Sequence, residues 1–352
     1  MINEIKISFI IPLYNSANSL KRCLDSIFEI RNVSYEIILI DDGSTDNTAN
    51  LCKIYTDKFD NIKYIYQTNK GPGAARNEGI RLCSGEFIWF VDSDDIIISY
   101  KLFEIFESTD KFEVVDIINF NYIENNLHRN IKTKIKYNYE CLYNKIIEGK
   151  KYVKDFIIPS YYNNGFLWNR LFRTEFIKKE NIYFGSERYQ EDFNFIIKAF
   201  SKTKKVLLLN EFHYEYGVRY NSKRRYYPDV LNDLNIVYNT LLEYIKEDKE
   251  EAIKNHVNVR WYNSVKYALI DNLYFSENSL SRKNKNIITK EIFYGDKVFL
   301  RLKKFDSESL KLKKDKWILK TIKNKSYNWF RIIRYGLITE QKIRNHIKRL
   351  IQ

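Results

Sequence analysis

Residues 6–12 (KISFIIP), 35–40 (YEIILI) and 86–91 (EFIWFV) are short runs of apolar and β-branched residues, and they decide the fold. Runs of this kind, bounded by polar turns, are typical of strands that are buried on both faces of a sheet. A further strand, the third in chain order, is expected at residues 61–66. The first hundred residues therefore predict four strands.

Helical segments alternate with these strands. Asn18 or Ser19 is expected to cap an amphipathic helix that reaches about Ile30. A second helix should follow residues 41–46, and a third should cover residues 74–82. Strands that alternate with helices predict a mostly parallel, Rossmann-like α/β sheet that is covered by helices and joined by right-handed crossovers.

The remainder of the chain is less regular. A helix is expected at residues 100–107 and a strand at 114–122, whereas residues 124–150 are polar and basic and are assigned no structure. Residues 226–310 have a helical, lysine-rich pattern.

From these patterns we expect three parts, which are an α/β domain (1–222), a helical extension (223–310) and a basic amphipathic tail (311–352). The extension is interpreted as a dimerisation module, an acceptor platform or a buttress, so a homodimer is one of the expected assemblies.

The net charge of +14 is concentrated at one end, because residues 311–352 carry 13 Lys/Arg against 2 Asp/Glu. Apolar residues recur there at helical spacing, for example at Phe330, Ile333 and Leu337. A basic, aromatic-rich amphipathic helix is typical of a segment that lies on an anionic membrane surface. The alternative is a helix packed on the body with a solvated basic face. Nucleic acid is not expected as a partner, since the charge is confined to one end.

Composition excludes several classes of protein. The chain is 44% hydrophobic and 16% aromatic, so it can bury a core. No apolar run approaches the ~18 residues of a membrane span. No secretory signal is visible, so a cytoplasmic protein is expected. Peripheral attachment to the inner face of the membrane is a further possibility. The four cysteines show no metal-site or redox spacing and are interpreted as buried thiols.

Polar clusters directly follow three of the expected strands. Tyr14-Asn15 follows the first, Asp41-Asp42 the second, and residues 92–95 (DSDD) the fourth. Because the carboxyl ends of parallel strands meet at one edge of a sheet, these clusters should converge on one crevice, where open α/β sheets bind ligands.

The side chains indicate which ligand this crevice would bind. Asp92 and Asp94 offer hard oxygen ligands that suit Mg²⁺ or Mn²⁺ beside a diphosphate. Arg76 can supply a second cation, Asp42 can accept a hydrogen bond from a base, and Tyr14 can stack on its ring. Taken singly, the Asp92-Ser93-Asp94 triplet is more typical of an acidic surface turn than of a ligand site. No phosphate-binding P-loop or dinucleotide fingerprint is present, which argues against ATP or GTP hydrolysis.

The order of these pieces resembles the family 2 inverting glycosyltransferases that build bacterial capsule, exopolysaccharide or lipopolysaccharide. The resemblance rests on residues 8–15 (SFIIPLYN), 38–46 (ILIDDGSTD), 69–77 (NKGPGAARN) and 90–95 (FVDSDD), and it extends to about residue 222. It implies a nucleotide-sugar-binding domain with the A-type fold.

The resemblance also implies roles for individual residues. Tyr14 and Asp42 would hold the nucleotide base, with Asp41 nearby. Arg76 would approach the diphosphate. Asp92 would contact the ribose, and Asp94 would ligate the metal. Further donor contacts are expected at Pro12, Asn69, Ser93 and Arg219.

The general base that the transfer reaction requires is expected at Glu191-Asp192, which matches the acidic pair of the family. Inverting transfer needs a general base that takes the proton of the acceptor hydroxyl. The resemblance assigns this role to Asp192, with Glu191 as a supporting group that positions the acceptor. Without the resemblance, an acidic pair before an apolar run is more typical of a favourable charge at a helix N-terminus.

Two further segments resemble parts of the family. Residues 168–173 (WNRLFR) match a segment on the acceptor side, and Trp168 is interpreted either as a sugar-stacking platform or as a core residue. Residues 213–222 (HYEYGVRYNS) resemble a closing loop, with Gly217 where an arginine is common, so Arg219 would contact the diphosphate alone. His213 is interpreted as a hydrogen-bonded loop histidine, in preference to a metal ligand.

The sequence thus predicts a Mg²⁺- or Mn²⁺-dependent inverting glycosyltransferase. It would move a hexose or N-acetylhexosamine from a UDP-sugar to a growing bacterial surface polysaccharide or a lipid-linked acceptor. The alternatives are a sugar nucleotidyltransferase and a catalytically inactive glycan-binding subunit.

Overall fold

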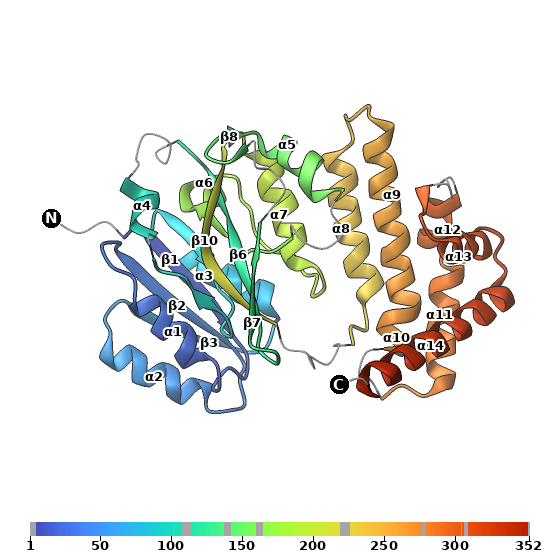
Figure 1. The fold of residues 1–352 in the computed structure, drawn as a ribbon, viewed down its shortest axis with the longest axis horizontal. Helices are drawn as coiled ribbons and strands as arrows, with labels where there is room; N and C mark the ends of the chain where they lie inside the picture. The colour runs from blue at the N-terminus through green and yellow to red at the C-terminus, as the bar shows by residue number, and fades with distance from the viewer. Residues whose placement is uncertain are drawn as a thin grey trace. The chain divides into compact units, whose positions relative to one another are not determined.

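The computed structural model has two compact units, residues 1–221 and 222–352 (Figure 1). It describes residues 5–100, 102–107, 114–136, 142–159, 165–218, 226–275, 279–303, 305 and 309–350. Each unit is described by itself.

The first unit is built on one mixed sheet whose main order is β3-β2-β1-β4-β9-β6-β10-β5. β7 pairs with β6 and β8 pairs with β10 outside this order. The strands are β1 (Ile7–Leu13), β2 (Tyr35–Asp42), β3 (Ile62–Gln67), β4 (Phe87–Phe90), β5 (Ile96–Ile97), β6 (Ile117–Asn126), β7 (Ile131–Ile135), β8 (Ile146–Ile147), β9 (Arg170–Arg173) and β10 (Val206–Val218).

Helices connect these strands along the chain (Figure 1). They are α1 (Leu20–Phe28), α2 (Thr48–Lys58), α3 (Pro72–Leu82), α4 (Leu102–Glu107), α5 (Gly149–Tyr152) with the π-helical turn Val153–Ile157, α6 (Thr174–Lys179) and α7 (Glu191–Lys202). With right-handed crossovers, α1 and α2 cover one face of the parallel strands and α3 covers the other.

The four strands expected from the first hundred residues are confirmed, and β3, β2, β1 and β4 are all parallel. Helix α3 lies close to this half of the sheet because Gly79 faces β1 without a side chain. A Cβ atom at Gly79 would stand 2.3 Å from Cγ2 of Ile10. This close approach fixes the start of α3, and therefore Arg76, over the sheet.

Beyond β4 the sheet is mixed. β9 lies antiparallel between β4 and β6, and β10 returns parallel to β6 with two irregularities in register. Residues 213–218, which were expected in a loop, form the second half of β10, so His213 is a strand residue. The stretch to which no structure was assigned contains β7 and β8. The fold prediction, an α/β domain followed by a helical region, is confirmed in this mixed form.

A cluster of aromatic rings holds α7 against the sheet. Phe195 of α7 packs edge-on against Phe90 of β4 and Phe172 of β9, with ring centroids 5.6 and 5.5 Å apart, and stacks on Phe184 at 4.3 Å. All four rings are buried. This packing fixes the first turn of α7 close to the strand ends.

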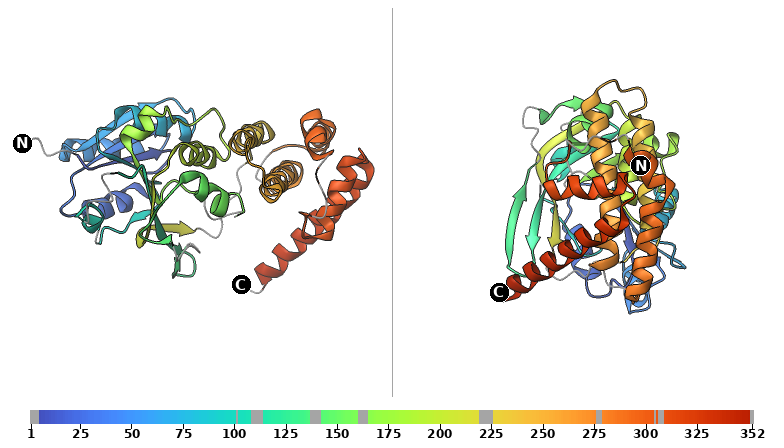
Figure 2. Two further views of the ribbon diagram at one scale, coloured as in Figure 1. Left: turned by 90° about the horizontal axis from the view of Figure 1, so that it is seen from above. Right: turned by 90° about the vertical axis from the view of Figure 1, so that its right-hand side faces the viewer.

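In the second unit every element that the structure describes is helical (Figure 2). The elements are α8 (Val230–Tyr244), α9 (Glu251–Lys266) with the π-helical turn Tyr267–Asp271, α10 (Asn272–Tyr274), α11 (Arg282–Tyr294), α12 (Asp296–Lys303), α13 (Lys313–Lys323) and α14 (Tyr327–Leu350). The helical expectation for 226–310 is confirmed. Both the expected extension and the expected tail lie in this one unit. Among the described residues, no helix has the length and apolarity to cross a bilayer.

Candidate active site

Hydrogen bonds tie together the loops that follow three parallel strands. The Ser16 hydroxyl, after β1, lies 2.8 Å from that of Ser93, after β4. The backbone N–H of Ser16 donates to Thr48 Oγ1 at 2.8 Å, and Asn15 Oδ1 accepts from the N–H of Thr45, both partners following β2. The polar clusters that the sequence places after separate strands therefore meet at one edge of the sheet.

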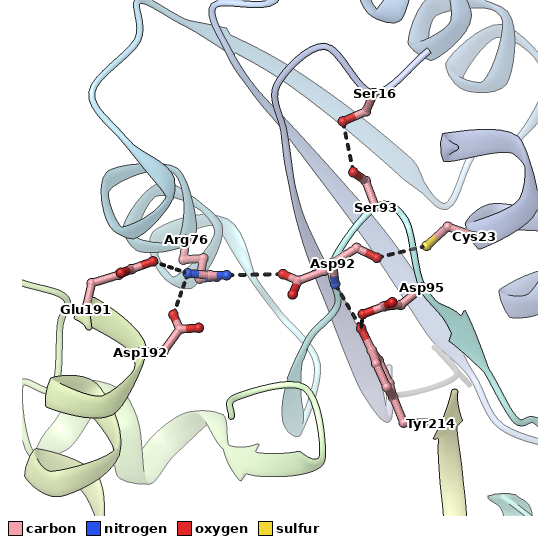
Figure 3. A network of polar contacts seen from close by, with 9 residues as sticks. All are labelled: Ser16, Cys23, Arg76, Asp92, Ser93, Asp95, Glu191, Asp192 and Tyr214. Atoms are coloured by element: carbon pink, nitrogen blue, oxygen red, sulfur yellow. Dashed lines mark hydrogen bonds and ion pairs between the residues drawn. The ribbon is translucent and has the colours of Figure 1, made fainter. Parts of the chain in front are cut away.

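Arg76 lies at the centre of a carboxylate cluster at this edge. Its Nη2 donates to Asp92 Oδ1 at 3.1 Å, and its Nη1 donates to Asp192 Oδ1 at 2.6 Å and to Glu191 Oε1 at 3.3 Å. Figure 3 shows the guanidinium between Asp92 on one side and the acidic pair on the other. The Arg76 side chain is 6% exposed, whereas those of Asp192 and Asp92 keep 30% and 35% of their surface. A ligand can reach these carboxylates without displacing Arg76.

Burial and charge shift the pKa values of this cluster. Burial raises the pKa of Asp192 well above its usual range, and the nearby Arg76 guanidinium opposes that rise. The pKa of Glu191 is raised for the same reason and against the same opposition. Burial lowers the pKa of Arg76, but the three carboxylates outweigh burial and leave it above its usual value, so the guanidinium stays charged.

The backbone turn before α7 orients Glu191 and Asp192 towards Arg76. Gln190, just before α7, adopts a left-handed conformation with φ of 61°, and Glu191 and Asp192 form the first turn of the helix. The helix N-terminus favours negative charge at these positions. Asn194, one turn on, donates from Nδ2 to the buried Glu187 at 2.6 Å and so braces the loop that leads into the helix.

A second network joins the DSDD turn to β10, and sequence reasoning missed it. Tyr214 donates from its hydroxyl to Asp95 Oδ2 at 2.7 Å and accepts from the N–H of Asp92 at 3.2 Å, while the N–H of Gly217 donates to Asp95 Oδ1 at 2.9 Å (Figure 3 shows the tyrosine contacts). Burial and the neighbouring Asp92 raise the pKa of Asp95 to about 8, although these hydrogen bonds oppose the rise. Asp95 therefore fixes the conformation of the turn. The presence of Asp95 as the fourth residue of the DSDD motif was the available signal.

Asp41 and Asp42 are buried and already have partners within the protein. Asp42 accepts from Gln67 Nε2 at 2.7 Å and from the backbone N–H groups of Lys70 and Gly71 at 2.8 Å each. Asp41 accepts from the N–H of Ser44 and the hydroxyl of Tyr64. In this structure Asp42 orders the loop before α3, and its contact with a base stays a prediction.

Other residues expected to contact the donor lie around the same edge. Tyr14 is 53% exposed directly after β1, and Pro12 is half-buried within that strand. Asn69 is exposed in the loop after β3, and its backbone N would lie 3.0 Å from a Cβ atom at Gly43. Arg219 lies outside the described residues.

The structure separates the two interpretations of Trp168. Its side chain is 3% exposed and stacks on Tyr214 at 4.6 Å and on Phe166 at 4.7 Å between ring centroids. It is a core residue here, so its ring offers no open face to a sugar. Burial lowers the pKa of His213 to about 4, and its Nδ1 lies 3.4 Å from the carbonyl oxygen of Ile98, in keeping with a neutral, structural histidine.

The chemistry of the DSDD turn fits a divalent cation that is completed by a ligand. Among the described residues, no group of three or more His, Cys, Asp or Glu side chains forms a ready-made metal site. Mg²⁺ is usually held by one or two carboxylates together with substrate phosphates, so such a group is not required. Asp94 is half-buried on this turn, and its carbonyl oxygen is fixed by Arg22 Nη2 at 2.5 Å.

Comparison with known proteins agrees with this geometry. Residues 8–170 match the family described as Glycosyl transferase family 2. The chain is 29% identical over 238 residues to the glycosyltransferase GlyA of Streptococcus pneumoniae, covering 65% of this chain and 33% of that protein. It is 30% identical over 221 residues to the cholesterol galactosyltransferase of Borreliella burgdorferi, covering 61% and 60%.

Solved structures share the fold. S. aureus TarS 1-349 in complex with UDP-GlcNAc superposes with a TM-score of 0.65 at 20% identity, covering 95% of this chain and 92% of that chain. The fold is thus the A-type α/β fold of glycosyltransferases. The family match places residues 8–170 in glycosyltransferase family 2. The chain spans about a third of GlyA and three fifths of the galactosyltransferase.

Proposed function

We propose that the protein is a metal-dependent inverting glycosyltransferase. It moves a hexose or N-acetylhexosamine from a UDP-sugar to a growing bacterial surface polysaccharide or a lipid-linked acceptor. The observation that carries the proposal is the ion cluster in which Arg76 binds Asp92, from the DSDD turn, and Asp192, from the start of α7. The cluster holds the expected general base beside the expected donor site.

Asp192 has the properties that a general base requires. Its raised pKa makes it a stronger base than a solvated carboxylate, and the charged Arg76 beside it favours the ionised form. As the acceptor oxygen attacks the anomeric carbon, the hydroxyl proton passes to the Asp192 carboxylate. The bond between the anomeric carbon and the diphosphate oxygen breaks, and UDP leaves from the opposite face of the sugar. Attack opposite the leaving group inverts the anomeric configuration.

The remaining residues bind and orient the donor. Asp94 would hold Mn²⁺ or Mg²⁺, and a divalent ion there supplies positive charge that stabilises the departing diphosphate. Asp92 is assigned to the ribose and exposed Tyr14 to the base. Glu191, whose side chain is 13% exposed and bound to Arg76, is assigned to the acceptor side.

The names of related proteins support the choice of donor. The structural neighbour TarS is described in complex with UDP-GlcNAc, and a relative from Bacillus spizizenii, 44% identical over 102 residues, is named poly(ribitol-phosphate) beta-glucosyltransferase. That match covers 28% of this chain and 16% of the relative. Hexose or N-acetylhexosamine donors and a cell-surface acceptor are therefore the first to test.

A panel of UDP-, GDP- and other nucleotide sugars, scored by thermal shift with and without Mn²⁺, tests the proposal. A true donor should raise the melting temperature in proportion to its affinity, and slow release of UDP should accompany it. The matched variant is Asp94→Ala, for which calorimetry should show loss of the metal-dependent part of UDP binding. Unchanged binding in that variant would remove the metal role. A protein stabilised by a nucleoside triphosphate and a sugar phosphate, and not by any nucleotide sugar, would be a nucleotidyltransferase.

A further inference from the structure

The last two helices bury one apolar face inside the second unit. Ile318 and Ile322 of α13 and Phe330 of α14 are fully or almost fully buried. The ring of Phe330 lies 5.0 Å from that of Phe293 of α11. On the same side of α14, the buried Arg334 donates from Nη1 to Thr289 of α11 at 3.1 Å. In the stripe that the sequence suggested as a membrane face, Phe330 is therefore a packing residue, and Ile333 and Leu337 are half-buried.

A second apolar strip remains exposed on α14. Trp329, Ile332 and Tyr335 are 66%, 59% and 64% exposed, and they follow one another at three-residue spacing on the side away from Phe330. Trp317 of α13 is 63% exposed as well. Single exposed apolar residues are common, but a run of large ones along one helix marks an interaction surface.

The two helices that carry these exposed residues have an excess of positive charge. Residues 313–350, from the start of α13 to the end of α14, contain 12 Lys/Arg against two acidic residues, Asp315 and Glu340. On α14, Arg331 is exposed whereas Arg334 is buried. On α13, the exposed Lys313 and Lys320 lie one turn before and one turn after Trp317, on the same helical face. Tryptophan and tyrosine favour the boundary between lipid headgroups and acyl chains, and lysines beside them attract anionic headgroups.

We propose that Trp329, Ile332 and Tyr335 of α14, called here the α14 strip, dock the protein on an anionic lipid bilayer. The flanking basic residues and Trp317 would contribute. The inference goes beyond the proposed function, because it assigns a surface of the second unit that glycosyl transfer does not require. A second copy of the chain is a poorer occupant, since a twofold interface would set two strips with the same excess of positive charge against each other.

The structure determines which variants can test this docking. Deleting residues 311–352 would remove buried core residues such as Ile318 and Ile322, so it would confound binding with folding. The test is instead the triple variant Trp329→Ser, Ile332→Ser, Tyr335→Ser in the full chain. Because all three side chains are exposed, folding should be preserved. The matched control is Leu300→Ser, which alters a residue of α12 that is 65% exposed in the same unit.

Co-sedimentation with vesicles measures the effect. Wild type and Leu300→Ser should bind vesicles of mixed phosphatidylglycerol and phosphatidylcholine, and the triple variant should bind them roughly tenfold or more weakly. Phosphatidylcholine vesicles alone, or high salt, should weaken wild-type binding.

Equal binding of wild type and triple variant would overturn the proposal, as would equal binding of wild type to neutral and anionic vesicles. So would a lipid-free wild-type dimer that the triple variant abolishes, since the strip would then join two copies. Release of UDP from a UDP-sugar in solution, without vesicles, measures the activity of the catalytic site independently of membrane binding. If UDP release fails while vesicle binding persists, only the proposed function is refuted.

Discussion

Replacing Arg76 with glutamine perturbs the cluster on which the proposed chemistry depends. The guanidinium lies 2.6 Å from Asp192 Oδ1 and carries the positive charge that opposes the burial-driven rise in the pKa of that carboxyl. With charge centres ~4 Å apart, Coulomb attraction is about 4 kcal/mol at an effective dielectric constant of about 20. Because the Asp192 side chain is 30% exposed, solvent reduces this energy, and loss of the guanidinium should raise the pKa of Asp192 further.

The sign of the effect on activity follows from the protonation state that the reaction needs. A general base must be ionised, so a higher pKa of Asp192 moves the acidic limb of the profile of kcat/KM against pH to more alkaline pH. Below that limb each unit costs about tenfold in rate, so the variant should lose about 10- to 100-fold more activity at acidic pH than at alkaline pH.

The assay is release of UDP from the donor in the presence of acceptor, followed across pH for wild type, Arg76→Gln and Arg76→Lys. Lysine retains the charge, so its acidic limb should lie closer to that of wild type. Circular dichroism and thermal melting serve as the folding control, because removal of one partner from a buried ion pair costs about 3–5 kcal/mol. A folded Arg76→Gln variant with an unshifted acidic limb would refute this role of Arg76.

Two other variants test how the site is built. Asp42→Ala leaves the backbone N–H groups of Lys70 and Gly71 without their acceptor. Urea titration should show a loss of stability of about 1–3 kcal/mol for each group that stays buried, and calorimetry should show weaker UDP binding. Full stability with full UDP affinity would show that Asp42 does not order this loop. Gly79→Ala would set a methyl group against Cγ2 of Ile10. The urea midpoint should fall by an amount equivalent to about 1–3 kcal/mol. An unchanged midpoint would mean that α3 and β1 can move apart to accommodate the methyl group without loss of stability.

The parallel half of the fold could be predicted from sequence because its signals are local. Buried runs such as residues 35–40 and 86–91 are bounded by turns, and the polar clusters stand directly at their ends. The mixed half is predictable only in part. The strand expected at residues 114–122 corresponds to β6, but β9 is only four residues long, and the family resemblance places the alternating polar and aromatic residues of β10 in a loop.

The sequence predicts which residues lie in the candidate site but not which of them bind one another. Arg76 was expected beside a diphosphate, whereas in the structure it binds Asp192, which is 116 residues away along the chain. A contact of that range depends on how α3 and α7 pack on the sheet, and no local pattern encodes it. The same limit applies to α14, whose sequence is apolar on two sides and does not reveal which side packs against α11.

The most direct test of the account is the variant Asp192→Asn, assayed for both donor binding and transfer. Asparagine preserves the shape of the side chain and removes its ability to accept a proton. We predict that transfer falls by about 10²- to 10⁴-fold while calorimetry shows near-normal binding of the UDP-sugar. Turnover close to that of wild type would show that the base lies elsewhere and would contradict the assignment of this cluster as the catalytic centre.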